Sequence, residues 1–197
     1  VVTGSGIGGI QTLEAQHQML VEKGQGRVSP FFIPMMIGNM AAAQIAIKFG
    51  MRGINENVVT ACASSTNAIG DAFRHIRDGY AEVMVCGGSE SCVNELGIGG
   101  FSSLKALNTT EDPNRASIPF DKERNGFVLG EGAGILILEE YEHAVARGAV
   151  IYGEVAGYGA TCDAHHITAP DPEGTQGAAC LKLAVKDAGM ELEDIDY

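Results

Sequence analysis

The stretch Val58-Val-Thr-Ala-Cys-Ala-Ser-Ser-Thr-Asn-Ala-Ile-Gly70 contains two hydrophobic patterns that meet at a cysteine. Residues 57–61 are mostly β-branched or small, which is typical of a short buried strand. Residues 64–78 carry apolar side chains at helical spacing, and Gly79 follows them where a C-terminal cap belongs. The sequence therefore predicts a strand, a tight junction that carries Cys62, and then a helix.

Cys62 is the first candidate for a chemically active residue. At the start of a helix, unpaired backbone N–H groups and the positive end of the helix dipole favour a thiolate over a thiol. The same N–H groups can hold a thioester oxygen as charge develops on it. Cysteine is also among the residue types most often buried, so a small side chain packed at a strand–helix junction is the competing interpretation.

The alternation of strand and helix patterns continues on both sides of this junction. Expected helices cover 11–23, 38–49 and 141–147, with a last one capped by Thr175 and ended by Gly189. Expected strands cover 1–3, 82–86 (closed by Gly87 and Gly88), 127–129, 134–139 and 150–157. Residues 94–124 are predicted to be irregular and 161–174 to be a loop. This order predicts an α/β sandwich with a buried mixed sheet, and the pattern change near Ala149 divides 1–148 from 149–197.

Composition and charge exclude several classes of protein. With 13 basic and 25 acidic residues among 197, the net charge of −12 repels phosphate backbones and disfavours nucleic-acid binding. No apolar run approaches the roughly 18 residues of a membrane span. Five scattered cysteines are typical of reduced thiols in the cytoplasm. The chain starts inside an apolar run, so we expect it to be part of a longer protein.

Short motifs also suggest dinucleotide binding and metal binding, but the residues around these motifs disfavour both. Gly4-Ser-Gly-Ile-Gly-Gly9 matches a dinucleotide fingerprint after a strand, but no second strand ending in an acidic residue follows about 20 residues later. A tight turn of small residues is the preferred interpretation. Cys86 and Cys92 are too far apart for a zinc knuckle, and His165-His166 has no second ligand pair at metal-site spacing, so we expect no metal.

Several motifs in order resemble those of the β-ketoacyl-acyl-carrier-protein synthases, the condensing enzymes of fatty-acid synthesis. Thr60-Ala-Cys-Ala-Ser-Ser65 resembles their active-site cysteine motif. The other matching stretches are 6–9, 29–32, 121–134, 139–144 and 166–170. The resemblance implies a thiolase-like fold, a layered αβαβα sandwich of two similar halves, of which this chain holds most of the first and the start of the second.

The resemblance also implies roles for particular residues. Cys62 would accept an acyl group from a carrier-protein thioester. Ile7 and Phe101 would line the acyl pocket, and Asp163, His166 and Thr168 would belong to a mobile loop that opens and closes the site. Arg27 and Lys105 would meet the acidic acyl carrier protein. The family forms homodimers and needs no metal or organic cofactor, because loss of carbon dioxide drives the reaction.

One departure from the family pattern limits this expectation. The resemblance implies two histidines that decarboxylate the malonyl thioester, which would follow shortly after Tyr197, and we do not expect His165 or His166 to take their roles. We therefore expect the 197 residues alone to hold the acyl-accepting thiol without completing condensation, and to expose apolar surface that favours aggregation. A polyketide ketosynthase and a non-catalytic chain-length factor remain as alternatives, and the presence of Cys62 argues against the second.

Overall fold

The structure is a computed structural model that describes residues 1–197. The chain folds into two compact units. Unit 1 comprises residues 1–68 and 86–136, and unit 2 comprises residues 69–85 and 137–197. None of the helices is both long and apolar enough to cross a lipid bilayer.

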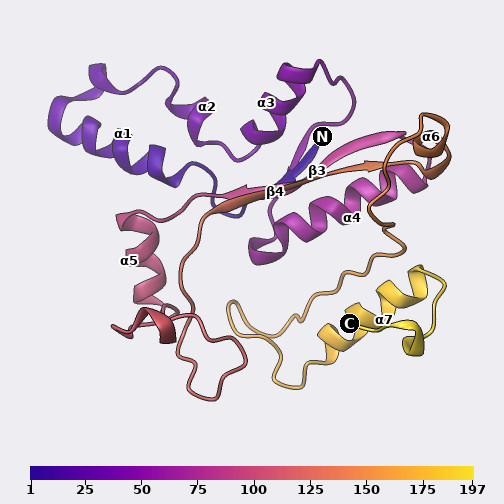
Figure 1. The fold of residues 1–197 in the computed structure, drawn as a ribbon. Helices are drawn as coiled ribbons and strands as arrows, with labels where there is room; N and C mark the ends of the chain where they lie inside the picture. Colours follow the sequence, from indigo (N-terminus) through magenta and orange to yellow (C-terminus); the bar gives the residue numbers. More distant parts are fainter. The chain divides into compact units, whose positions relative to one another are not determined.

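Strands and helices alternate along the chain, as the sequence patterns indicate (Figure 1). The strands are β1 (Val2–Gly4), β2 (Glu56–Val58), β3 (Val83–Glu90) and β4 (Gly132–Glu139). The α-helices are α1 (Ile10–Lys23), α2 (Phe32–Met36), α3 (Met40–Phe49), α4 (Ser64–Arg77), α5 (Glu95–Ser103), α6 (Tyr141–Ala146) and α7 (Thr175–Asp187). Short 3-10 turns η1 to η4 cover Gln25–Arg27, Ala61–Ala63, Pro113–Arg115 and Leu192–Asp194.

The four strands form one mixed sheet in the order β2-β1-β3-β4. Strand β1 is parallel to both neighbours, and Val2 lies opposite Glu56 on one side and Cys86 on the other. The direction of β4 follows from a backbone hydrogen bond of 2.9 Å, which the N–H of Glu140, just after β4, donates to the carbonyl of Glu82, just before β3. Such a bond joins antiparallel neighbours. The predicted mixed α/β sheet is confirmed.

Glycines let the first turn of α4 approach the sheet closely. A Cβ on Gly4 would lie 2.3 Å from the carbonyl carbon of Ser64, and one on Gly88 would lie 2.0 Å from Oγ of Ser65. The prediction that Gly87 and Gly88 close a strand is therefore wrong. Both continue β3, paired with Thr3 and Gly4, because this stretch of strand has no room for side chains.

Two further sequence predictions are wrong in unit 1, and one helix there was not predicted. Residues 94–124 contain α5, which Asn94 caps by accepting the N–H of Gly97 at 3.1 Å. Its several glycines hide it from a propensity-based prediction. Residues 127–129 form no strand with β4, since Phe127 makes only an isolated bridge with Leu107. Helix α2 was not expected at all.

Unit 2 departs from the prediction at two places. Residues 150–157 do not form a strand, because a ladder requires a partner and none of the strands pairs with them. The N-cap of helix α7 is Gly174, whose φ of 63° is left-handed, and Thr175 is the first residue of the helix and not its cap. The predicted end of α7 is confirmed, since Gly189 also has a positive φ of 68°.

Apolar side chains form a small core and leave a large apolar surface. The largest fully buried side chains are those of Val2, Thr3 and Cys86, all from the centre of the sheet. Phe120 in unit 1 is 99% exposed and Tyr152 in unit 2 is 98% exposed. The expected exposure of apolar side chains is confirmed, and the aggregation expected from it stays a prediction.

A carboxylate at the end of β4 fixes helix α6 within unit 2. Glu139 accepts hydrogen bonds from Arg147 Nε at 2.7 Å and Nη2 at 2.5 Å, and its Oε1 lies 2.5 Å from Nδ1 of His143. The side chain of Glu139 is only 9% exposed. The hydrogen bonds from Arg147, followed by those from His143 and by their charges, lower the pKa of Glu139 from 4.5 to about 2.

We expect the anchoring of α6 to weaken in acid. A carboxyl whose pKa is depressed in the folded state contributes stability above its unfolded pKa, near 4.5, and loses it as pH falls toward about 2. The protection factors of the α6 amides, which are corrected for the intrinsic pH dependence of amide exchange, should therefore fall over this interval in the full-length protein. Glu139→Gln should show lower protection factors already at pH 7 and little further fall in acid. Equal acid sensitivity in the two proteins would contradict the assignment.

Candidate functional site

Cys62 lies in the 3-10 turn η2, immediately after β2 and immediately before α4. Its side chain is exposed, whereas Cys86 and Cys92 are buried. The interpretation of Cys62 as a small side chain packed in the core is therefore wrong. The strand ends at Val58, three residues before the predicted end, because the chain already turns ahead of the cysteine.

The backbone before Cys62 is strained and is held by a buried hydroxyl. Ala61 has a φ of +50°, a conformation that residues with a Cβ rarely adopt. The Ser64 hydroxyl accepts the N–H of Thr60 at 2.9 Å and donates to the carbonyl of Ala61 at 2.7 Å. Ser64 is 3% exposed, so it closes the turn from inside the fold. The sequence reasoning missed this residue, although a serine at a strand–helix junction often bonds the local backbone.

The glycine-rich turn after β1 lies next to the turn that carries Cys62. A Cβ built on Gly6 would be 3.5 Å from the carbonyl oxygen of Ala61 and 3.1 Å from Oε2 of Glu90. Glu90 accepts the N–H groups of Gly6 at 2.7 Å and of Ile7 at 3.1 Å, and the hydroxyl of Ser5 at 3.1 Å. A carboxylate thus occupies the donors that a pyrophosphate would need, which agrees with the interpretation of this motif as a tight turn.

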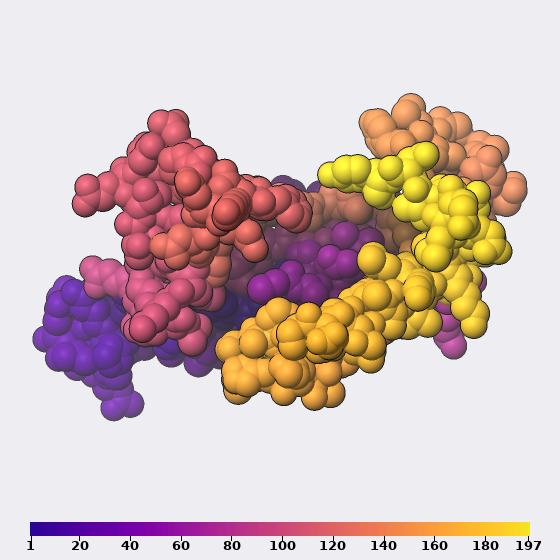
Figure 2. Space-filling model, turned by 90° about the horizontal axis from the view of Figure 1, so that it is seen from below, coloured from indigo at the N-terminus to yellow at the C-terminus, as the bar shows by residue number.

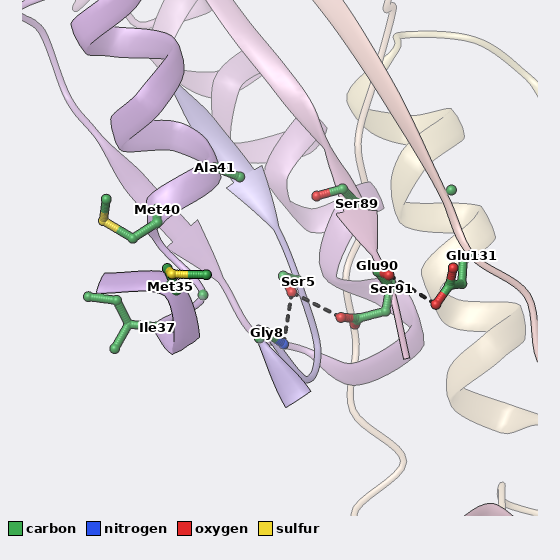
Figure 3. A pocket seen from close by; sticks show the side chains of 13 residues that line it. Ser5, Gly8, Met35, Ile37, Met40, Ala41, Ser89, Glu90, Ser91 and Glu131 are labelled. Carbon is green, nitrogen blue, oxygen red and sulfur yellow. Dashed lines mark hydrogen bonds between the residues drawn. The ribbon is translucent and has the colours of Figure 1, made fainter. Parts of the chain in front are cut away.

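A cavity of about 490 Å³ opens beside this turn in unit 1 (Figure 3). Ser5, Gly8 and Gly9 form one wall, and the side chains of Met35, Ile37 and Met40 form another. The side chain of Ile7 is 43% exposed and is not among the lining residues. The structure therefore brings Gly6, the neighbour of Ile7, close to the carbonyl of Ala61, and the Ile7 side chain does not line this cavity.

A second carboxylate, Glu131, shapes the polar end of the cavity. It accepts hydrogen bonds from the Ser91 hydroxyl, the Val93 N–H and the Gln11 amide, each at 2.9 Å. These bonds, that from Val93 first, lower the pKa of Glu131 below its ordinary value. Glu131 fixes the segment after β3, and it makes no hydrogen bond to the turn at Ser5–Ile7.

Phe101 lies in α5 of unit 1 and packs against one other aromatic ring. Its ring centroid is 5.4 Å from that of Phe127 with an interplanar angle of 78°, which is an edge-to-face pair. Arg27, at the end of η1, and Lys105, just after α5, are both exposed in unit 1 and form no ion pair.

Asp163, His166 and Thr168 belong to the loop before α7 in unit 2, whereas Cys62 belongs to unit 1. Nδ1 of His166 accepts the N–H groups of Thr168 and Ala169, both at 3.1 Å. Asp163 accepts the N–H of Asp171 at 3.0 Å. Each residue therefore holds a turn of its own loop, which continues into α7 as one orange-to-yellow band in Figure 2.

We expect four of the five cysteines to react with iodoacetamide in a definite order. Burial raises the pKa of Cys86 to about 11 and also raises that of Cys92, so both should react slowly. Cys62 and Cys162 are exposed, and Cys62 should react faster because it lies at the start of a helix. Peptide mass mapping of the folded full-length protein measures all five rates. Labelling of Cys86 before Cys62 would contradict this order.

The fold and the position of Cys62 define a mixed α/β protein with an exposed cysteine between a parallel strand and a helix. The sequence model of the β-ketoacyl synthase N-terminal domain matches residues 1–144, and that of the β-ketoacyl synthase C-terminal domain matches residues 152–197. The chain belongs to the β-ketoacyl synthase family, and its fold is the N-terminal domain and the start of the C-terminal domain of a thiolase-like fold.

Particular relatives are similar over the whole chain. The 3-oxoacyl-[acyl-carrier-protein] synthase 2 of Synechocystis sp. is 54% identical over 198 residues, covering 100% of this chain and 48% of that protein. A β-ketoacyl synthase from Burkholderia phymatum superimposes with a TM-score of 0.91 at 34% identity, covering 100% of this chain and 48% of its own. A chain of a second solved structure superimposes with a TM-score of 0.89 at 36% identity, covering 100% of this chain and 50% of that chain. That structure is described as a type II PKS acyl-carrier protein in complex with its ketosynthase bound to the hexaketide. The chain spans about half the length of the curated relatives it matches.

Proposed function

We propose that this chain is the acyl-accepting part of a 3-oxoacyl-acyl-carrier-protein synthase of fatty-acid elongation. The observation that carries the proposal is the exposed Cys62 on a strained turn, fixed by the buried Ser64 at the start of α4. The 54% identity to a synthase with this activity supports it. A polyketide ketosynthase is the second candidate, favoured by the structural likeness at 36% identity.

The reaction proceeds in two steps. The Cys62 thiolate attacks the carbonyl of an acyl-carrier thioester, a C–S bond to Cys62 forms as the C–S bond to the carrier breaks, and the carrier leaves as its thiolate. Malonyl carrier protein then loses carbon dioxide, and the enolate carbon attacks the acyl-enzyme carbonyl. The new C–C bond forms as the C–S bond to Cys62 breaks, and Cys62 leaves as its thiolate. The histidines of the second step lie outside these 197 residues.

The remaining residues take supporting roles in this proposal. Ile7 and Phe101 line the acyl pocket, and the loop with Asp163, His166 and Thr168 opens and closes it. Arg27 and Lys105, exposed and without ion pairs, form a local basic patch for the acidic carrier protein on an otherwise acidic chain.

The whole protein is a cytoplasmic homodimer that uses no metal or organic cofactor, because loss of carbon dioxide supplies the driving force. Within this chain the division between the two ketoacyl-synthase halves falls after residue 148.

The test is acyl transfer measured in the full-length protein. Incubation with a saturated acyl-carrier thioester should add one acyl mass to the peptide that contains Cys62. Addition of malonyl carrier protein should then release the acyl group from Cys62 as a 3-oxoacyl product that is two carbons longer than the acyl group supplied. A preference for aromatic-type poly-β-keto substrates over saturated acyl chains would favour the polyketide candidate, and no adduct with either substrate would reject both.

A further inference from the structure

Glu90 is the last residue of β3, and its carboxylate binds a turn of unit 1 that lies close to the Cys62 turn. The parallel register pairs Gly4 with Gly88, so the continuation of this register sets Glu90 beside Gly6. Its carboxylate accepts three hydrogen bonds, all from the turn Ser5–Ile7. Figure 3 shows the carboxylate of Glu90 directed at Ser5, whose hydroxyl in turn accepts the N–H of Gly8 at 3.1 Å.

These bonds satisfy backbone donors that the turn itself leaves without a partner. The N–H groups of Gly6 and Ile7 both point to Oε2 of Glu90, at 2.7 Å and 3.1 Å. The Gly6 N–H is half-buried and the Ile7 N–H is exposed. A half-buried N–H group that loses its acceptor destabilises the local backbone conformation. Without the Glu90 side chain, Gly6 and Ile7 lose the acceptor that holds this part of the turn.

The same turn lies against the backbone that carries the reactive cysteine. Gly6 is placed between Glu90 and the carbonyl of Ala61, which precedes Cys62. A shift of Gly6 therefore moves a turn that lies against the backbone immediately before Cys62, the residue that would carry the acyl chain. A displacement of about 1 Å in such a position changes rates substantially even when the reacting groups are intact.

We propose that Glu90 is a positioning residue that holds the Ser5–Ile7 turn against the Cys62 turn and thereby sets the acyl-chain preference of the enzyme. This inference rests on the proposed acyl transfer to Cys62. It assigns no chemical step to Glu90, whose carboxylate acts through the backbone of Gly6 and Ile7.

The test compares kcat/KM of the full-length protein for a 16-carbon and a 6-carbon acyl-carrier thioester. In Glu90→Ala the ratio of the two values should change about tenfold, while the iodoacetamide rate at Cys62 stays within about twofold. A loss of folded protein alone would lower both substrates equally and leave the ratio unchanged. An unchanged ratio in Glu90→Ala would therefore overturn the proposal.

Glu90→Gln is the conservative variant, and its geometry predicts rescue. The amide oxygen can accept from Gly6 and Ile7, and the amide NH₂ can donate to the Ser5 hydroxyl, which is an acceptor already. The ratio in Glu90→Gln should therefore stay close to the wild-type value. A ratio as altered as in Glu90→Ala would contradict a role through hydrogen bonding.

Two further variants keep the experiment decisive. Ser5→Ala removes one of the three donors and should shift the ratio in the same direction by a smaller factor, so it replaces Glu90→Ala if that variant does not fold. Asp112→Ala is the matched control, because Asp112 also accepts a backbone N–H and a side-chain amide, both from Asn114, but lies outside the cavity and the Ser5–Ile7 turn, and its ratio should not change. Failure of the wild-type protein to acylate Cys62 would reject the proposed function, whereas normal acylation with equal ratios in all variants would reject only the role of Glu90.

Discussion

On the proposed function, replacing Cys62 by alanine in the full-length protein should abolish the covalent acyl-enzyme and lower elongation by at least about 10⁴-fold. The variant keeps the shape of the turn, since the turn is closed by Ser64 through Thr60 and Ala61 and not by the thiol. The loss should therefore appear without a change in thermal stability. Intact-protein mass spectrometry after incubation with an acyl-carrier thioester measures the adduct, and circular dichroism measures the melting temperature.

Cys162 provides the matched control for this prediction. It is also exposed, but it lies in the loop region before α7 and not at the start of a helix. Cys162→Ala should keep the acyl adduct and the elongation rate within about twofold, because exposure alone does not make a thiol an effective nucleophile. An acyl adduct on Cys62→Ala of the same mass as on the wild-type protein would show that another residue accepts the acyl group.

The sequence was sufficient to predict the elements whose causes are local. The strand, the cysteine turn and helix α4 follow from hydrophobic spacing between residues 57 and 78, and Gly79, Gly148 and Gly189 have the positive φ expected after helices. Helices α1, α3, α6 and α7 were predicted within a few residues for the same reason. Cys62 itself could be found because a strand followed at once by a helix has a particular chemistry at its junction.

The remaining features depend on contacts between residues far apart in sequence. Glu90 bonds to residues 83 to 85 positions earlier, and nothing in the local pattern of β3 shows that these donors need an acceptor. In the sequence, Gly88 is typical of the end of a strand. A glycine is required there because Ser65, which is distant in the sequence, leaves no room for a Cβ. Residues 150–157 have a composition typical of a strand, but a strand also requires a neighbour to pair with, which composition does not predict.

Ser64 shows an intermediate case between local and distant causes. Its bonds to Thr60 and Ala61 are local and recur at such junctions, so the motif could have been read from the sequence. Its burial depends on β1, because Gly4 lies against its carbonyl. Two residues therefore position Cys62. The role of Ser64 could have been predicted from the sequence, whereas the need for glycine at position 4 is explained only by the fold.

Replacing Gly4 by alanine is the second change for which we expect a large effect, this time on stability. The new Cβ would lie 2.3 Å from the carbonyl carbon of Ser64, 2.4 Å from its oxygen and 2.6 Å from the N of Ser65. All three are backbone atoms, so no side-chain rotation relieves the overlap, and β1 and the first turn of α4 must separate. Forced overpacking of this kind costs about 3 kcal/mol or more.

The separation should also move Cys62, because η2 continues directly into α4. Gly4→Ala should therefore lower both the melting temperature and the rate of acyl transfer to Cys62 in the full-length protein, the latter at least about tenfold. Gly53→Ala is the control, since a Cβ there meets nothing within 4 Å and Gly53 has no positive φ. It should leave both quantities unchanged. If Gly4→Ala melts like Gly53→Ala and acylates at the same rate, then the contact of β1 with α4 is not what holds the cysteine in place.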